Sequence, residues 1–294
     1  MRWVEDLHLC EELEGVLSLD VHLGVDDMKF AKRMSLLGTE TAFEVMAKAK
    51  ALEAQGKDMI YLQIGEPDFP TPKHIIEAGV AALRGGQTHY CASSGILPLK
   101  EAIVKEVVSR RGVAPSLHNI VVTPGAKPIL FFVILAMIEA GDEVIFPVMG
   151  FPLYVKIALQ LDLKPKYVDV EEKHLTIDVN QLEKSITSNT KGIVVTHLFG
   201  YPCNMDKVME IANKNGIPVI EDCAQSYDSF YKGQETGTFG YAGIFSCSLM
   251  KVPTTLGGGI LLTEDEELVN ILFIKSIKPK KKKYAKAAEP DFDL

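Results

Sequence analysis

One acidic residue and one lysine in the C-terminal half of the sequence each follow an apolar run. Asp222 closes the run in IPVIEDCAQ, and Lys251 follows a second run in GIFSCSLMK. A lysine amine attacks an aldehyde only when it is neutral, and burial or a nearby cation lowers its pKa enough to supply that form. A carboxylate that faces a pyridine nitrogen favours the protonated ring. Either residue alone is more often an ordinary strand end or a solvated loop lysine, but together they predict a Schiff-base site for an aromatic aldehyde.

A second chemical feature is the turn at Gly125, Ala126 and Lys127, which follows an apolar run and precedes a long apolar helix. Pro128 suits the first turn of that helix, where a missing N–H group costs no hydrogen bond. Backbone N–H groups at a helix N-terminus bind anions. The turn therefore predicts a phosphate-binding site, although many α/β proteins carry a similar turn for structural reasons.

These residues lie between apolar runs that alternate with helical patterns. Seven runs indicate strands, at 121–126, 142–148, 164–170, 191–198, 217–224, 242–248 and 258–263. Apolar helices, such as 128–141 and 204–216, separate most of them. This alternation predicts an α/β fold with a mostly parallel seven-stranded sheet covered by helices on both faces. Ligands of such sheets bind beyond the carboxyl ends of the strands, where the residues named above fall.

The N-terminal third of the sequence predicts helices and one short strand. Apolar spacing indicates helices at 39–57, 73–86 and 98–112. The run 59–65 is typical of a short strand, and it leads into a rigid, proline-rich turn at 66–72. The residues before this region are acidic and moderately apolar, and they carry no chemistry that we can assign.

The composition argues against several classes of function. A formal net charge of −8 disfavours a nucleic-acid partner, which favours a basic surface. The most apolar run, Ile129–Ile138, is shorter than the roughly 20 residues that span a bilayer, so no membrane partner is expected. The five cysteines include no Cys-x-x-Cys pair, so neither a zinc site nor a disulfide framework is indicated. A reducing cytoplasm is the expected location.

Four segments of the sequence together resemble the fold-type I pyridoxal-phosphate aminotransferases. The stretch 217–263, with its Asp-x-x-Gln motif, resembles the nucleotide-sugar aminotransferases of the DegT/DnrJ type. The upstream segments LQIGEPDFPTP, HYCASSGILPLKEAI and PGAKPIL with GDEVIFPVMGFPLY resemble the class I amino-acid aminotransferases instead. The resemblance runs from about residue 35 to about residue 272, with the motifs in the order of the family.

The resemblance implies pyridoxal 5'-phosphate as the cofactor. Lys251 would form the Schiff base and later carry a proton, and Asp222 would face the ring nitrogen. Nucleotide-sugar enzymes use the serine five residues before the lysine for phosphate, whereas class I enzymes use the serine three residues before it. The implied phosphate ligands are Gly125, Ala126, Lys127, Ser246 and Ser248.

The resemblance also implies roles for five residues outside this group. Phe151 would stack on the cofactor ring, and Gln225 would contact the ring oxygen. Tyr90 would reach the phosphate of the other subunit in a homodimer, and Gly65 and His197 match positions near the substrate. Simpler explanations also exist: Phe151 as a core aromatic residue, Gly65 as part of a turn, and His197 as a hydrogen-bonded core histidine.

The sequence departs from the family at its C-terminal end. Family members continue beyond the last strand into a small lobe, and in class I enzymes this lobe supplies the arginine that binds the substrate carboxylate. Here a basic and then acidic low-complexity tail follows, which we expect to be disordered. The expected parts are an N-terminal extension at 1–34, a helix and strand of the small lobe at 35–85, a cofactor-binding large domain at 86–274 and the tail at 275–294.

The sequence thus predicts an aminotransferase that moves an amino group from an amino donor to an oxo acceptor. Amino acids have a slight edge over nucleotide sugars as substrates, because the upstream segments line the substrate entrance in class I enzymes. Another pyridoxal-phosphate enzyme, such as a lyase or decarboxylase, is one alternative, since the fold does not choose between these reactions. A non-catalytic remnant that binds the cofactor or a partner chain is another, and the missing small lobe is the reason to consider it.

Overall fold

The computed structural model describes residues 31, 41–65, 69–111, 115–248, 251 and 257–272. The chain divides into a unit of residues 1–37 and a unit of residues 38–294, and every element below belongs to the second unit. The expected N-terminal extension, apart from Ala31, and the expected tail lie outside the described residues. Among the helices that the structure describes, none combines the length and the apolar character needed to cross a membrane.

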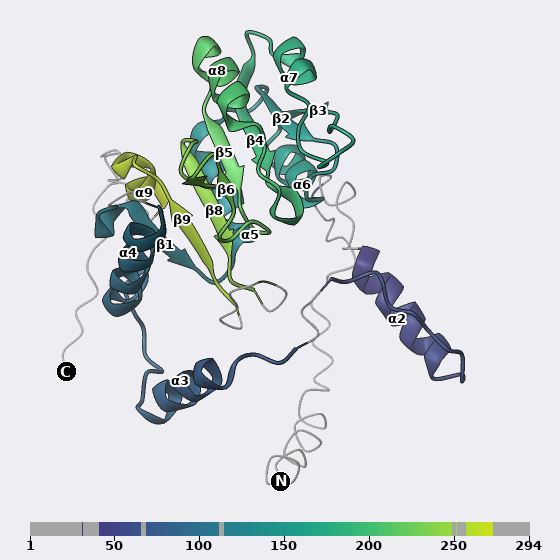
Figure 1. The fold of residues 1–294 in the computed structure, drawn as a ribbon, viewed down its shortest axis with the longest axis vertical. Coiled ribbons are helices and arrows are strands. Elements are labelled where there is room, and N and C mark those ends of the chain that lie inside the picture. The colour runs from purple at the N-terminus through teal and green to yellow at the C-terminus, as the bar shows by residue number, and fades with distance from the viewer. Residues whose placement is uncertain are drawn as a thin grey trace, which may run out of the picture. The chain divides into compact units, whose positions relative to one another are not determined.

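The centre of the fold is a seven-stranded sheet (Figure 1). Its strands, in spatial order, are β1 (Ile120–Thr123), β9 (Gly259–Leu262), β8 (Ala242–Ser246), β5 (Val219–Asp222), β4 (Thr190–Thr196), β2 (Glu143–Pro147) and β3 (Lys164–Val168). Strand β9 is antiparallel to both of its neighbours, and the other neighbouring pairs are parallel. The predicted α/β fold with a mostly parallel seven-stranded sheet is confirmed.

Helices cover both faces of the sheet (Figure 1). One face packs against α5 (Ala126–Met137), α6 (Leu153–Gln160) and α9 (Glu266–Leu272). The other face packs against α4 (Leu97–Arg111), α7 (Val179–Ser185) and α8 (Met205–Asn215). Burial on both faces explains why the central strands are almost continuously apolar rather than alternating.

Strand β5 shows how the two faces are divided. Ile220 belongs to the core cluster around α5, whereas Val219 belongs to the cluster around α8. Because successive side chains of a strand point to opposite faces, Asp222 lies on the α5 side and Glu221 on the α8 side. The two neighbouring carboxylates therefore face opposite sides of the sheet and have different surroundings.

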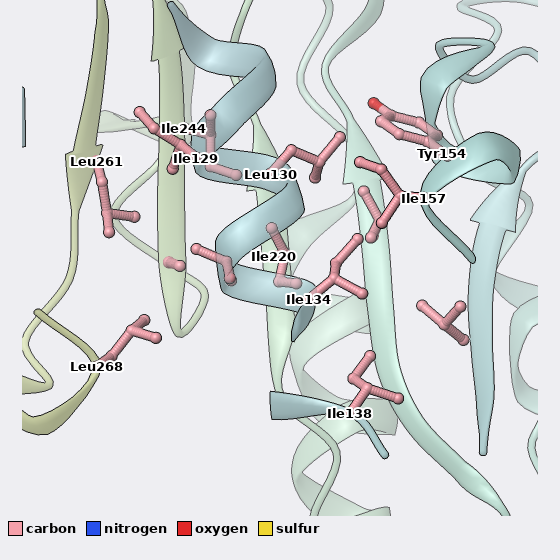
Figure 2. Packing of buried hydrophobic residues seen from close by; sticks show 14 of the residues in the cluster. Ile129, Leu130, Ile134, Ile138, Tyr154, Ile157, Ile220, Ile244, Leu261 and Leu268 are labelled. Atoms are coloured by element: carbon pink, nitrogen blue, oxygen red, sulfur yellow. The ribbon is translucent and has the colours of Figure 1, made fainter. Parts of the chain in front are cut away.

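Helix α5 is the centre of the larger core cluster (Figure 2). It buries Ile129, Leu130, Val133 and Ile134 among side chains of the sheet, of α6 and of α9. Full burial of one such side chain contributes about 1.5–3 kcal/mol to folding. This packing fixes the axis of the helix, and with it the direction of the N–H groups at its N-terminus.

The remaining elements are short or precede the strands of the sheet in the chain. They are α2 (Thr41–Glu53), α3 (Lys73–Arg84), two short 3-10 helices, η3 (Leu117–Asn119) and η4 (Leu198–Gly200), and a hairpin of β6 (Phe230–Tyr231) and β7 (Gln234–Glu235). The helices expected at 39–57 and 73–86 are thus present with shorter bounds.

The strand expected at 59–65 is wrong. These residues have no regular structure, and no described strand pairs with them. Ile60 and Leu62 are 82% and 87% exposed. An apolar run becomes a strand only where another strand can accept its backbone hydrogen bonds, and sequence pattern alone does not reveal that partner.

Candidate active site

The predicted Asp and Lys lie at the edge of the sheet where the parallel strands end. Asp222 is the last residue of β5, and Lys251 stands five positions after Ser246, the last residue of β8. Strands β5 and β8 are parallel neighbours, with Asp222 opposite Ile244. Residues that follow parallel neighbours come together at the carboxyl edge of a sheet, which is where α/β proteins bind ligands.

Asp222 is buried, and both of its carboxylate oxygens accept hydrogen bonds. The hydroxyl of Tyr154 donates to Oδ2, and the backbone N–H of Ala224 donates to Oδ1 at 2.9 Å. The same hydroxyl lies 2.9 Å from Oγ1 of Thr196, which stands opposite Asp222 in the pairing of β4 with β5. Burial and the charge of Asp222 raise the pKa of Tyr154 well above its ordinary value. The tyrosine therefore keeps its proton and holds the carboxylate in one orientation.

Lys251 has a pKa below the ordinary value of a lysine. Its side chain is half-buried, and this loss of water lowers the pKa because it disfavours the ammonium form. The negative charge of Asp222 acts in the opposite direction and raises the pKa, but burial has the larger effect. The backbone N–H of Lys251 donates to the carbonyl of Ser248 at 3.0 Å. At a given pH, more of this lysine is neutral than of an exposed one.

The predicted phosphate turn is the N-terminus of α5. Gly125 is the cap residue, Ala126 is the first helical residue, and the hydroxyl of Thr123 donates to the Gly125 carbonyl at 2.6 Å. Strand β9 passes so close that a Cβ atom on Gly259 would lie 2.5 Å from the carbonyl carbon of Gly125 and 2.6 Å from the nitrogen of Ala126. The N–H groups of a first helical turn have no partner within the helix, so this end can receive an anion.

Phe151 and Lys127 lie beside these residues. Phe151 meets Tyr154 edge to face, with ring centroids 6.3 Å apart and an interplanar angle of 80°. The ammonium group of Lys127 lies 5.4 Å from the centroid of the Phe151 ring. Since Tyr154 also contacts Asp222, the predicted stacking residue and the predicted partner of the ring nitrogen belong to one chain of contacts.

The two predicted serines lie on the segment that leads to Lys251. Ser246 ends β8, and its hydroxyl oxygen accepts a hydrogen bond from the N–H of Ser248 at 3.5 Å. Both side chains are half-buried. Both serines therefore remain candidates for a contact with a phosphate oxygen.

Three other predicted residues are exposed. Gln225 accepts a hydrogen bond from the N–H of Phe199 at 3.1 Å, and it thereby holds a phenylalanine whose φ angle is 54°. Tyr90 is fully exposed. Gly65 is exposed, and a Cβ atom there would meet nothing within 4 Å, so space does not require a glycine.

The substrate contact expected of His197 does not fit the structure. Its side chain is fully buried, and both ring nitrogens are engaged. Nδ1 accepts the N–H of Cys203 at 3.0 Å, and Nε2 lies 3.0 Å from Oε2 of Glu221. The alternative of a hydrogen-bonded core histidine describes this residue, because it presents no free nitrogen to a ligand.

Sequence reasoning missed Tyr154, Thr196 and Glu221. Tyr154 follows Phe151 by three positions, a spacing that places two residues on one face of a helix. Thr196 comes directly before His197 at a strand end, and Glu221 comes directly before Asp222. The alternation of side chains along β5 could have indicated that these two adjacent acids face opposite ways.

The sheet and the residues at its carboxyl edge define a protein with the fold of the fold-type I aminotransferases. Among solved structures, the aspartate aminotransferase of Rhizobium meliloti has a TM-score of 0.72 at 26% sequence identity, with 84% of this chain and 66% of that chain covered. Residues 113–288 match the model of the DegT/DnrJ/EryC1/StrS aminotransferase family, and these residues are more than half of the chain. The chain belongs to this family.

Relatives of known function include two kinds of enzyme. The aspartate aminotransferase of Bacillus subtilis (strain 168) is 40% identical over 172 residues, which are 57% of this chain and 43% of that enzyme. The GDP-perosamine synthase of Escherichia coli O157:H7 is 38% identical over 140 residues, which are 47% of this chain and 38% of that enzyme. The chain thus matches less than half of the length of either relative.

Proposed function

We propose that the protein is a pyridoxal-phosphate-dependent aminotransferase that moves an amino group between an amino acid and an oxo acceptor. The observation that carries the proposal is that a buried carboxylate, Asp222, and a half-buried lysine, Lys251, follow neighbouring parallel strands at the carboxyl edge of the sheet. Membership of an aminotransferase family agrees with this arrangement.

The residues at the carboxyl edge of the sheet suit each part of this cofactor. The start of α5 suits the phosphate, because the Gly259 position lets β9 pack against the helix end without a side chain between them. Lys251 suits the aldehyde, and Asp222 suits the ring nitrogen. When bound, pyridoxal phosphate withdraws electrons from the α-carbon of an amino acid, which makes the α-proton removable.

The side chains of this protein would then position the reactants and move the proton. Asp222 would accept a hydrogen bond from the ring nitrogen, and the hydrogen bonds from Tyr154 and Ala224 would keep its carboxylate in place. The neutral Nζ of Lys251 would take up the proton that leaves the α-carbon, hold it as an ammonium group and give it back later in the reaction. The charge of Asp222 stabilises the lysine ammonium between these two transfers.

We favour amino acids over nucleotide sugars as the substrates of this protein. The match to the aspartate aminotransferase covers 57% of the chain, and the match to the nucleotide-sugar enzyme covers 47%. Turnover with a panel of amino acids and 2-oxo acids, beside the same panel with nucleotide-linked oxo sugars as acceptors, separates the two classes.

A homodimer is part of the proposal. Helix α3 contains no buried residue, and its apolar residues Ile76 and Leu83 are 47% and 66% exposed. Exposed apolar surface favours a protein partner. The fully exposed Tyr90 is free to reach a second copy, and light scattering of the purified protein tests the dimer. A reducing cytoplasm suits the free thiols of Cys91, Cys203, Cys223 and Cys247.

Borohydride reduction tests the proposed function. The purified protein is incubated with pyridoxal phosphate, reduced and digested, and the modified lysine is mapped. We expect the label on Lys251, and its absence from Lys251→Ala but not from the exposed-site control Lys191→Ala. A label on another lysine would overturn the site. Formation of a keto acid together with pyridoxamine phosphate then identifies amino transfer and excludes a lyase or a decarboxylase.

A further inference from the structure

A second carboxylate, Glu221, is fully buried beside Asp222 but on the other face of the sheet. It accepts four hydrogen bonds. The backbone N–H of Gly237 donates to Oε2 at 2.8 Å, and those of Phe239 and Gly240 donate to Oε1 at 2.8 and 2.6 Å. The fourth contact is His197 Nε2 at 3.0 Å. Three backbone N–H groups and one ring nitrogen therefore surround this carboxylate.

The proton of His197 can be placed from its other nitrogen. Nδ1 accepts the N–H of Cys203, so it carries no proton of its own. The ring proton therefore sits on Nε2 and is donated to Glu221. His197 thus donates to Glu221 through Nε2 and accepts through Nδ1, so no water or ligand atom is needed to satisfy either side chain.

This arrangement opposes a metal ion at the same place. Ligand atoms of His197, Glu221 and Cys223 lie within 4.8 Å of one another, as in a metal site. A metal on Nε2 would have to displace the proton there, and Nδ1 cannot take that proton while it faces the Cys203 N–H. Both oxygens of Glu221 already face backbone donors. The cluster is a hydrogen-bonded anchor.

The anchor connects the end of β5 with the residue that follows β4 and with the turn that precedes β8. The backbone N–H of His197, after β4, donates to the carbonyl of Asp222 at 3.2 Å. The turn held by Glu221 leads within two residues of Gly240 into β8, the strand that carries Ser246 and precedes Lys251. The anchor thus contacts the backbone of Asp222 and the start of β8, the strand that leads to Lys251.

Three glycines allow the turn to lie this close. A Cβ atom on Gly237 would meet the Phe245 ring at 2.3 Å, and one on Gly240 would meet the Val219 carbonyl oxygen at 2.5 Å. A Cβ atom on Gly243 would meet the Gly237 carbonyl oxygen at 2.3 Å. The backbone of residues 237–243 is therefore packed against β5 and β8 without intervening side chains.

We propose that Glu221 and His197 are positioning residues of the cofactor site, which set the place of Asp222 and of β8 relative to each other. The proposal rests on the proposed function. Neither residue touches the reactants, since both are fully buried on the α8 side of the sheet. Their effect on the cofactor passes through the backbone of β5 and through the carboxylate of Asp222.

The main test is Glu221→Gln, which keeps the shape but places an NH₂ group among four donors. A stability control is Val219→Ala, on the same strand and face and also buried. Melting temperature and affinity for pyridoxal phosphate are measured for both. We expect Glu221→Gln to weaken cofactor binding about tenfold more than a control of equal melting temperature. Equal losses at equal stability would show a purely structural role and overturn the proposal.

A double-mutant cycle shows whether the effect passes through Asp222. In the Asp222→Asn background, Glu221→Gln is expected to cause a smaller loss of cofactor affinity than in the wild-type background. The reason is that the negative charge of Asp222, which the anchor is proposed to position, is already absent. An undiminished loss would contradict the proposal. If Glu221→Gln does not fold, His197→Gln, which can still donate one N–H, is compared with His197→Ala. We expect the glutamine to retain more cofactor affinity, and equal losses would count against the anchor.

The failure of this proposal differs from the failure of the proposed function. If the wild-type protein does not bind pyridoxal phosphate, both fall. If it binds and Lys251 is labelled, but the two variants follow the stability control, the aminotransferase proposal stands and the positioning proposal alone falls. Hydrogen exchange of the amides of Gly237, Phe239 and Gly240 measures the anchor directly, and Glu221→Gln should speed their exchange.

Discussion

The hydroxyl of Tyr154 on α6 donates a hydrogen bond to the carboxylate of Asp222 at the end of β5, although 68 positions separate them in the chain. The tyrosine ring is only 1% exposed and stacks on Phe146, with centroids 5.2 Å apart and planes inclined by 14°. A helix thus fixes the direction of a carboxylate that a strand carries. The orientation of Asp222 depends on the packing of α6 as much as on β5.

Tyr154→Phe should weaken both the fold and cofactor binding. The variant keeps the stacked ring but removes a hydrogen bond to a charged group, which contributes about 1.5–3 kcal/mol to the free energy of unfolding. Chemical denaturation measures this loss, and fluorescence titration with pyridoxal phosphate measures the affinity. Tyr167→Phe is the matched control, because its ring is 48% exposed on β3. Equal stability of the two variants would contradict the importance of the Tyr154 hydroxyl.

The pKa of Lys251 leads to a prediction on pH. Burial lowers this pKa, so the neutral amine becomes available below the pH at which an exposed lysine, with a pKa of about 10.4, would react. The rate at which borohydride traps pyridoxal phosphate on Lys251 should therefore rise with pH and level off before that value. The charge of Asp222 raises the lysine pKa, so Asp222→Asn should move the midpoint to lower pH. A midpoint that stays fixed or moves to higher pH would show that the charge of Asp222 does not raise the pKa of Lys251.

Gly259→Ala should disturb the predicted phosphate site. The added methyl group would lie 2.5 Å from the Gly125 carbonyl carbon and 2.6 Å from the Ala126 nitrogen, which are backbone atoms that cannot turn away. Overpacking of this kind costs about 1–3 kcal/mol of unfolding free energy, and we expect weaker binding of pyridoxal phosphate and of inorganic phosphate. Gly257→Ala is the control, because the nearest atom to its methyl group would be the Pro124 carbonyl oxygen at 3.7 Å. Similar phosphate affinity in both variants would argue against this site.

The sheet could be predicted well because the sequence pattern that indicates it is local. Seven apolar runs separated by helices identify a doubly covered parallel sheet, and the positions of Asp222 and Lys251 follow from the ends of their runs. The order of the strands was not predicted, and no local signal indicates that β9 runs antiparallel between β1 and β8.

Two errors and one omission share a cause. The run 59–65 has the composition of a strand but no partner strand among the described residues, and His197 was grouped with the substrate although Glu221 and Cys203 occupy its nitrogens. Tyr154 was missed because its partner is distant in the chain. Such long-range contacts decide whether a polar side chain faces a ligand or the core, and the periodicity of the sequence does not reveal them.

Asp222→Asn is expected to separate cofactor attachment from turnover. The amide has nearly the shape of the carboxylate. Its one oxygen can still accept the Ala224 N–H, and its NH₂ group can donate to the Tyr154 hydroxyl, which then donates to Thr196, but the amide cannot hold the charge that favours a protonated ring. Lys251 should still be labelled by borohydride, while turnover with the best amino donor falls by about a hundredfold or more. Asp169→Ala, an exposed carboxylate after β3, is the control and should keep full turnover. Circular dichroism verifies the fold, and an Asp222→Asn variant that is folded and fully active would remove the ring-nitrogen role from this residue.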